Sequence, residues 1–217
     1  DFIRINVPDF NWAVYSIYST LSSKKEKEEG REVPDYEPRA VAIWPRLRPR
    51  YKYQWTKGFT NIYASYAQGK YQDMHYKFVH LALITRKELI KRTSQRNTNP
   101  NCLMCRVLRG INNEESHTHV IFECDSAYDI WSLIKLYVKQ LMPNQEVHLL
   151  MLALGICPPN VTGPIARLVV TLIQITMHSI WKNRNAMENE KEEPDTRKTV
   201  AAIRKKFSAC VSSLYHK

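Results

Sequence analysis

Four closely spaced side chains of metal-binding types, three cysteines and one histidine, constrain the fold of this 217-residue chain more than any other feature of its sequence. They occur as two pairs, Cys102-x2-Cys105 and His119-x4-Cys124. The first pair can direct two thiolates at one ion from a single tight turn, and the second can complete a tetrahedral set from a turn or from the start of a helix. Thiolate and imidazole ligands favour zinc over magnesium or calcium. The spacing therefore predicts a Zn2+ ion, and because protein fills all four positions, a structural one.

Two alternatives compete with this ligand set. His117 could replace His119, although the spacing favours His119. The cysteines could also be unrelated buried residues, because a single C-x2-C pair is common. Cys157 and Cys210 lie on apolar stretches and are expected to be small core residues. Because the chain has an odd number of cysteines, 5, and three of them lie near a histidine, we expect an intracellular, reducing location, nuclear or cytoplasmic, rather than a disulfide scaffold.

Hydrophobic patterning predicts helices in most of the chain. Only 6 glycines are present, whereas sandwiches and barrels need many glycines for their turns. Apolar residues recur at helical spacing in six segments, which are residues 10–22, about 71–96, 126–141, 146–154, 164–190 and 195–214. The predicted fold class is therefore mostly α, a helical domain with an embedded small CCHC zinc finger.

Three regions are expected along the chain. Residues 1–70 combine an N-terminal helix with a basic and aromatic segment that Pro45 and Pro49 should keep extended. Residues 71–141 contain helices that flank the zinc module at 102–124, and residues 142–217 form a C-terminal helical region.

Local signals predict where several helices begin and end. Thr85 and Glu88 fit a capping box, and Gly155 can end a short apolar helix. Pro164 is tolerated in the first turn of the long helix that follows, and Asp195 can cap the last helix. The longest apolar stretch, 165–180, contains charged and polar residues, so it is expected to be a buried helix rather than a membrane span.

The chain is strongly basic, with 32 Lys and Arg against 21 Asp and Glu and a net charge of +11. Polyanions are the usual partners of such proteins, because each neutralised phosphate releases counterions. A first candidate segment combines cations with aromatic rings, as sites for single strands do; it contains Arg46, Arg48, Arg50, Tyr51, Lys52, Tyr53, Trp55 and Lys57. The alternative is that these rings pack onto the helical core.

Two further basic patches follow the first one. The patch next to the finger consists of Arg86, Lys87, Lys91, Arg92, Arg106 and Arg109. Zinc knuckles commonly present such flanking cations to RNA or DNA. A third patch on the last helix, which includes Lys206, fits a solvated face as well as a phosphate contact.

Catalytic motifs are absent from the sequence. It contains no aromatic-x-Asp-Asp turn for paired metal ions, no phosphate-binding glycine loop and no HExxH motif. This chain by itself is therefore expected to be non-catalytic.

The two ligand pairs belong to a longer pattern. Cys102-Leu-Met-Cys105 is followed by Glu115-Ser-His-Thr-His119-Val-Ile-Phe-Glu-Cys124 and then by Trp131. This resembles the zinc-binding domain downstream of the polymerase in non-LTR (LINE-type) retrotransposon reverse transcriptases, with its C-x2-C, spacer, E-T-x-x-H-L-F-x-x-C and tryptophan. Residues 80–85 (HLALIT) and 180–185 (IWKNRN) resemble two further helical motifs of that family. The spacer between Cys105 and His119 is longer than the family usually has.

The resemblance implies both a ligand set and a function. It makes the two pairs zinc ligands and selects His119 over His117. It also implies a helical carboxy-terminal region that binds template RNA and/or target DNA for target-primed reverse transcription, with the polymerase portion of the same polypeptide or complex as partner. No membrane partner is expected, because no apolar stretch is long enough to span one. Because the chain begins at Asp1, we expect it to be a piece of a longer polypeptide. The alternative is a non-catalytic protein-interaction or structural module that docks on a polymerase or another subunit.

Overall fold

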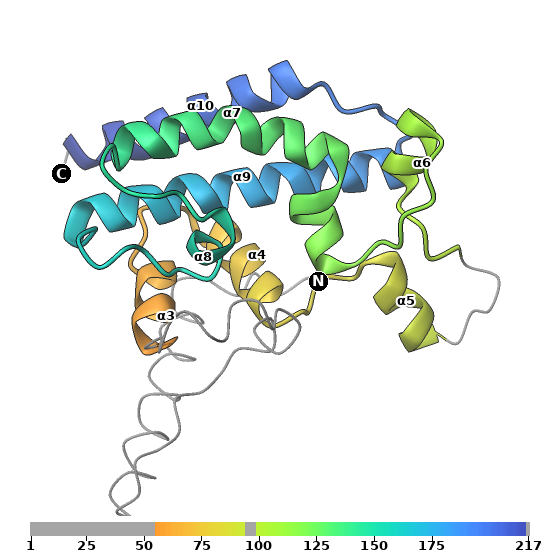
Figure 1. The fold of residues 1–217 in the computed structure, drawn as a ribbon, viewed down its shortest axis with the longest axis horizontal. Helices are drawn as coiled ribbons and strands as arrows, with labels where there is room; N and C mark the ends of the chain where they lie inside the picture. Colours follow the sequence, from red (N-terminus) through yellow and green to blue (C-terminus); the bar gives the residue numbers. More distant parts are fainter. Residues whose placement is uncertain (1–54, 94–98, 216–217) are drawn as a thin grey trace, which may run out of the picture.

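The computed structural model describes residues 55–93 and 99–215, which are mostly helical and contain no β-strand (Figure 1). The fold class is thereby confirmed as mostly α. The elements are α3 (Trp55–Tyr63), α4 (Gly69–Val79), α5 (Arg86–Thr93), α6 (Leu103–Arg109), the π-helical turn η2 (His119–Glu123), α7 (Asp125–Leu141), α8 (Leu149–Leu152), α9 (Gly163–Asn189) and α10 (Thr196–Tyr215).

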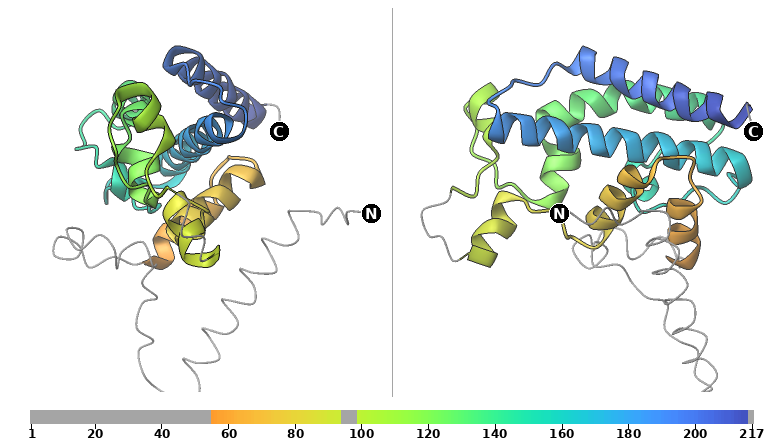
Figure 2. Two further views of the ribbon diagram at one scale, coloured as in Figure 1. Left: turned by 90° about the vertical axis from the view of Figure 1, so that its right-hand side faces the viewer. Right: turned by 180° about the vertical axis from the view of Figure 1, so that it is seen from behind.

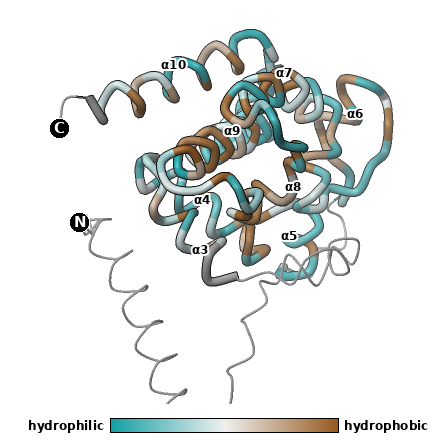
Figure 3. Tube along the Cα trace, turned by 60° about the vertical axis from the view of Figure 1, so that its left-hand side comes forward, coloured by the Kyte–Doolittle hydropathy of each residue, from teal (hydrophilic) through white to brown (hydrophobic). Residues whose placement is uncertain are grey.

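The long helix α9 runs through the centre of the fold. α7 and α10 pack along one side of it and contact each other, while α3 and α4 pack against the opposite side (Figure 1 and Figure 2). Its buried residues extend from Ala166 to Met187, and its tube is predominantly hydrophobic in Figure 3. By length and composition α9 could cross a membrane, but 67% of its apolar window is buried inside the fold. That burial fits the predicted core helix.

The buried amide of Gln174, inside α9, is satisfied by neighbouring groups. Gln174 donates to the carbonyl of Ile62 at 2.9 Å and accepts from the hydroxyl of Ser65 at 2.6 Å. Because a buried amide without partners would cost free energy, these bonds also fix α3 and the turn after it against α9.

Two predicted helix starts are confirmed by their capping bonds. Thr85 Oγ1 accepts from the backbone N–H of Glu88 at 3.3 Å, although the Glu88 carboxylate binds Lys91 instead of closing the capping box. Asp195 Oδ1 accepts from the N–H of Lys198 at 2.9 Å, immediately before α10. Gly155 follows α8 with a φ of 75°, the left-handed conformation expected of a glycine after a helix.

The predicted extended segment is wrong in part. Residues 55–63 form the helix α3, because Pro45 and Pro49 restrict only their own surroundings and leave the backbone from Trp55 onward free to be helical. The rest of that segment and the predicted helix at 10–22 lie outside the described residues.

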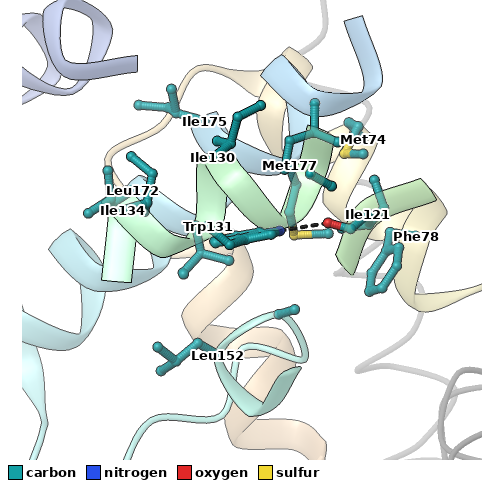
Figure 4. Packing of buried hydrophobic residues seen from close by; sticks show 14 of the residues in the cluster. Met74, Phe78, Ile121, Ile130, Trp131, Ile134, Leu152, Leu172, Ile175 and Met177 are labelled. Atoms are coloured by element: carbon teal, nitrogen blue, oxygen red, sulfur yellow. Dashed lines mark hydrogen bonds between the residues drawn. The ribbon is translucent and has the colours of Figure 1, made fainter. Parts of the chain in front are cut away.

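One hydrophobic core joins the predicted middle and C-terminal regions. Trp131 of α7 is 3% exposed and donates its indole N–H to the carbonyl of Ile121 at 2.6 Å (Figure 4). It also stacks on Phe122, with ring centroids 5.4 Å apart. Leu172 and Met177 of α9 belong to the same cluster as Trp131. The segment that carries the candidate metal ligands is therefore packed directly onto the central helix.

Candidate metal centre

The first cysteine pair is positioned by the start of α6. Cys102 immediately precedes the helix and Cys105 lies in its first turn. The backbone N–H of Cys102 donates to the carbonyl of Asn113 at 2.7 Å, and Asn101 forms an isolated antiparallel bridge with Glu114. α6 ends at Arg109, and Gly110, with a φ of 67°, caps it and reverses the chain direction. The long spacer thus contains the rest of α6 and a loop that folds back on the cysteines.

The second pair is positioned by the π-helical turn η2. The backbone N–H of Cys124 donates to the carbonyl of His119 at 2.7 Å, five residues earlier. A π turn closes on the fifth residue, so it brings Cys124 back over His119, whereas an α-helix would rotate the two apart. The N–H of His119 is itself bonded to Ser116 Oγ at 3.0 Å. This turn explains why a four-residue gap suits two ligands of one site.

The four side chains converge on one point. The ligand atoms of Cys102, Cys105, His119 and Cys124 all lie within 4.8 Å of one another, and all four residues are buried. Cys105 Sγ is 3.3 Å from His119 Nε2 and 3.7 Å from Cys124 Sγ. Two sulfurs bound to one tetrahedral zinc would be about 3.8 Å apart, given Zn–S bonds of about 2.3 Å. The cluster could therefore hold a metal ion.

His117 is used elsewhere in the structure. Its Nε2 is 2.9 Å from the carbonyl oxygen of Leu83, and its side chain lies in a buried position. Since the carbonyl can only accept, Nε2 carries the proton and donates this bond. Burial also lowers the pKa of His117. His117 therefore links the segment 102–124 to the loop before α5 and does not belong to the cluster.

The electrostatics of the cluster favour a cation at its centre. Hydrogen bonding from Cys124, opposed by burial and helped by His119, lowers the pKa of Cys102 to about 4. Burial and the charge of Cys102 raise the pKa of Cys105. The hydrogen bond to Cys102, followed by burial, raises the pKa of Cys124. Three thiols thus compete to carry one negative charge, and a divalent ion would stabilise all three as thiolates.

A buried ion-pair network adjoins the cluster. Glu115, whose side chain is 1% exposed, accepts from Arg184 Nη2 at 2.5 Å, from Arg184 Nε at 3.3 Å and from the backbone N–H of Arg86 at 2.7 Å. Arg86 in turn forms a two-pronged pair with Glu188, at 2.6 and 2.7 Å. Because α5 and α9 meet the segment 102–124 through these groups, the network fixes the orientation of all three.

The cavity beside Cys102 and Cys124 is too small for a substrate. A cavity lined by Cys102, Cys124 and neighbouring core residues measures only about 10 Å3. Asn113 Nδ2 lies 4.0 Å from Cys105 Sγ and provides an outer contact. A buried site with four converging ligands and so little space suits a structural ion rather than a catalytic one.

The first predicted nucleic-acid segment is largely beyond the described part of the chain. Arg46, Arg48, Arg50, Tyr51, Lys52 and Tyr53 lie outside the described residues. Trp55 and Lys57 are in α3, but the description does not extend to their side chains. Their role in binding stays a prediction.

The second predicted patch is mostly paired with acids. Arg86 pairs with Glu188, Lys87 with Glu114, Lys91 with Glu88 and Arg109 with Asp125. The pairs of Lys87 and Lys91 are exposed and weak, whereas the side chains of Arg86 and Glu188 are 15% and 16% exposed. In the described structure no acid is paired with Arg92 or Arg106. This surface therefore offers less uncompensated charge than its composition suggests.

Sequence reasoning gave no role to Asn113, Arg184 or Glu188. Arg184 and Glu115 each occur in a quoted motif, so two oppositely charged residues in the two motifs were the available signal for a pair. Nothing in the sequence indicated that the two motifs would bind each other.

The fold and the site define a helical protein whose core includes a buried cluster of three cysteines and one histidine that could hold a metal ion. Comparisons with protein-family models, with curated proteins and with solved structures found no match for this chain.

Proposed function

We propose that the cluster of Cys102, Cys105, His119 and Cys124 binds one Zn2+ ion as a structural staple. The convergence of the four ligand atoms within 4.8 Å carries this proposal. When bound, the ion would supply a strong cross-link between α6 and η2. The protein itself positions the ligands, because hydrogen bonds from the backbone N–H groups of Cys102 and His119 hold these residues in place.

The metal content of the purified chain tests the proposal. We expect about one zinc per chain by elemental analysis, as four protein ligands fill one tetrahedral site. Cys124→Ser should lose the metal, whereas Cys210→Ser, which changes a half-buried cysteine outside the cluster, should retain it. Cobalt-loaded protein should show strong thiolate-to-metal absorption bands. Equal metal content in the two variants would refute the ligand assignment.

We further propose that the chain is the nucleic-acid-binding carboxy-terminal region of a non-LTR-type reverse transcriptase polypeptide. It would bind template RNA and/or target DNA and position it for a polymerase elsewhere in that polypeptide. The observation that best supports this reading is the Glu115–Arg184 pair, because it joins the finger motif to the IWKNRN motif. The net charge of +11 supports a polyanionic partner.

Binding of labelled single-stranded RNA and DNA, followed by fluorescence anisotropy between about 50 and 200 mM salt, tests this function. We expect affinity to fall steeply with salt. Replacing Arg50, Lys52 and Trp55 together by alanine should weaken binding and flatten its salt dependence. Affinity that stays at background for the unmodified chain would refute the function. Unchanged affinity in the triple variant would refute only the role of that segment.

A protein-interaction module is the second candidate, and one surface favours it. Val107, Leu108 and Ile111 of the finger are 50%, 39% and 46% exposed. Neighbouring exposed apolar side chains are typical of contact surfaces. Tight binding to a polymerase fragment together with background affinity for nucleic acid would favour this candidate. Replacing Val107 and Leu108 by serine should then abolish the protein contact.

A further inference from the structure

A group of three lysines lies where α4, α9 and α10 meet, away from the metal centre. Lys70 is in the first turn of α4, Lys182 is on α9 and Lys206 is on α10. The amine of Lys206 donates to the hydroxyl of Ser179 at 3.4 Å. Ser179 lies one helical turn before Lys182 on the same face of α9. Lys182 and Lys206 therefore project from adjacent positions on two packed helices.

Lys70 reaches the same place through an aromatic contact. Its amine lies 5.1 Å from the centre of the Tyr71 ring. Tyr71 meets the ring of His178 edge-on, with centroids 4.9 Å apart. His178 is next to Ser179 and one turn before Lys182. Lys70 of α4 and Lys206 of α10 therefore both lie close to the short stretch of α9 that carries Lys182.

No acid balances these lysines within the described structure. The ion pairs found there include none of Lys70, Lys182 and Lys206. α9 contains no Asp or Glu before Glu188, and α10 contains none at all. The nearest acid on α4, Asp73, is paired with Lys77. The positive charge of the group is thus open to an external partner.

Burial and this uncompensated positive charge together lower the pKa values of His178 and Lys206. Burial, followed by the charges of Lys206, Lys70 and Lys182, lowers the pKa of His178 to about 4. Burial and the two other lysines also lower the pKa of Lys206. In addition, His178 Nδ1 is buried and has no hydrogen-bond partner in the described structure. An anion between the three amines would relieve their mutual repulsion.

We propose that Lys70, Lys182 and Lys206 form a binding site for the phosphate groups of a nucleic-acid backbone. The inference rests on the proposed nucleic-acid-binding function and adds the surface that performs it. Ammonium groups act as point charges that contact phosphates without reading bases. Tyr71 is 4% exposed, so its ring is not available for stacking. The site therefore holds the backbone without sequence preference, and it differs from the basic patch predicted beside the finger.

The test replaces all three lysines by glutamine and measures single-stranded RNA and DNA binding. Each phosphate contact on a single strand contributes about 0.7 to the salt slope, or about fivefold in affinity at 0.1 M salt. Three contacts predict a loss of about 100-fold and a slope smaller by about 2. Lys135→Gln, Lys139→Gln and Arg167→Gln together form the matched control, because they remove the same charge from exposed positions on α7 and α9.

Four outcomes decide the proposal. A large loss in the lysine variant, with the control close to the unmodified chain, supports it. Equal losses in both variants overturn it, because only net charge would then matter, while the proposed function stands. Failure of the unmodified chain to bind any oligonucleotide overturns both. Binding to vesicles that contain an anionic lipid, without binding to oligonucleotides, also overturns it. Urea unfolding confirms that each variant is folded, and the exposed Lys70→Gln and Lys182→Gln changes repeat the test singly.

Discussion

Replacement of Arg184 by methionine should destabilise the protein strongly. The change removes the two-pronged partner of Glu115 from a site where the two side chains are 13% and 1% exposed. Burial already raises the pKa of Glu115, even though the hydrogen bond and charge of Arg184 oppose that effect. Without Arg184, the one hydrogen-bond partner that the carboxylate keeps among the described residues is the backbone N–H of Arg86. Loss of one member of a buried pair costs about 3–5 kcal/mol.

Protonation limits that cost. An unpaired Glu115 can take up a proton, which removes its charge. We therefore expect Arg184→Met to lower the free energy of unfolding by about 3 kcal/mol at pH 7, the lower end of that range. Glu115→Gln removes the charge but keeps an acceptor for Arg184 and should cost about 1–2 kcal/mol. The combination of both changes should cost less than their sum, because it leaves neither charge unpaired.

Urea unfolding of zinc-loaded protein at constant pH measures these free energies. Lys77→Met is the control, because it breaks an exposed pair with Asp73, with side chains 50% and 49% exposed, that should contribute less than about 1 kcal/mol. If Arg184→Met lowers the free energy of unfolding by no more than Lys77→Met does, the Arg184–Glu115 pair does not hold the segment 102–124 on α9. Strict additivity in the double variant would also contradict the reasoning.

The remaining predictions concern pH, backbone packing and the metal. Burial lowers the pKa of His75 to about 4. Between about pH 6.5 and 4 the unfolded chain therefore binds more protons than the folded chain. Up to about 3 kcal/mol of folding stability should be lost as pH falls through that range. His75→Gln should make this dependence shallower in unfolding curves, and His178, whose pKa is also lowered to about 4, should keep part of it. Gly155→Ala should destabilise by more than about 2 kcal/mol, because its Cβ would lie 2.3 Å from the carbonyl oxygen of Gly58. Gly110→Ala, with a φ of 67° and no atom within 4 Å, should cost only about 1 kcal/mol in thermal unfolding. Chelation of the metal should unfold the described helices in one transition by circular dichroism.

Local chemistry explains which features could be predicted from the sequence. Within each ligand pair, two or four residues separate the two ligands, so backbone geometry over about one turn decides whether the two side chains of that pair point the same way. The caps at Thr85 and Asp195 are equally local. In each case the residues that decide the structure are neighbours in the chain, and their pattern is visible in the sequence.

Charge pairing could not be predicted in the same way. Arg86 and Glu188 are 102 residues apart, and Arg184 and Glu115 are 69 apart. Their contact depends on how α5, the finger and α9 pack, which no local pattern encodes. Counting cations therefore favoured Arg86 as a nucleic-acid-binding residue, although in the structure its guanidinium forms an ion pair with Glu188. The same reasoning missed Lys70 and Lys182, because their neighbourhood is created by three helices that are distant in sequence.

The position of the three cysteines and one histidine makes this candidate metal centre part of the central core rather than a separate module. Cys102, Cys105 and Cys124 belong to the same buried cluster as Val169 and Ile173 of α9. η2 and α6 both contact α9 directly, and Glu115 fixes the intervening loop to Arg184. Loss of the proposed ion would leave competing thiols and a buried ion pair inside the core. Amide hydrogen exchange after chelation should therefore rise along α9 as well as in the finger. Exchange confined to residues 102–124 would show instead that the finger folds independently of the helices.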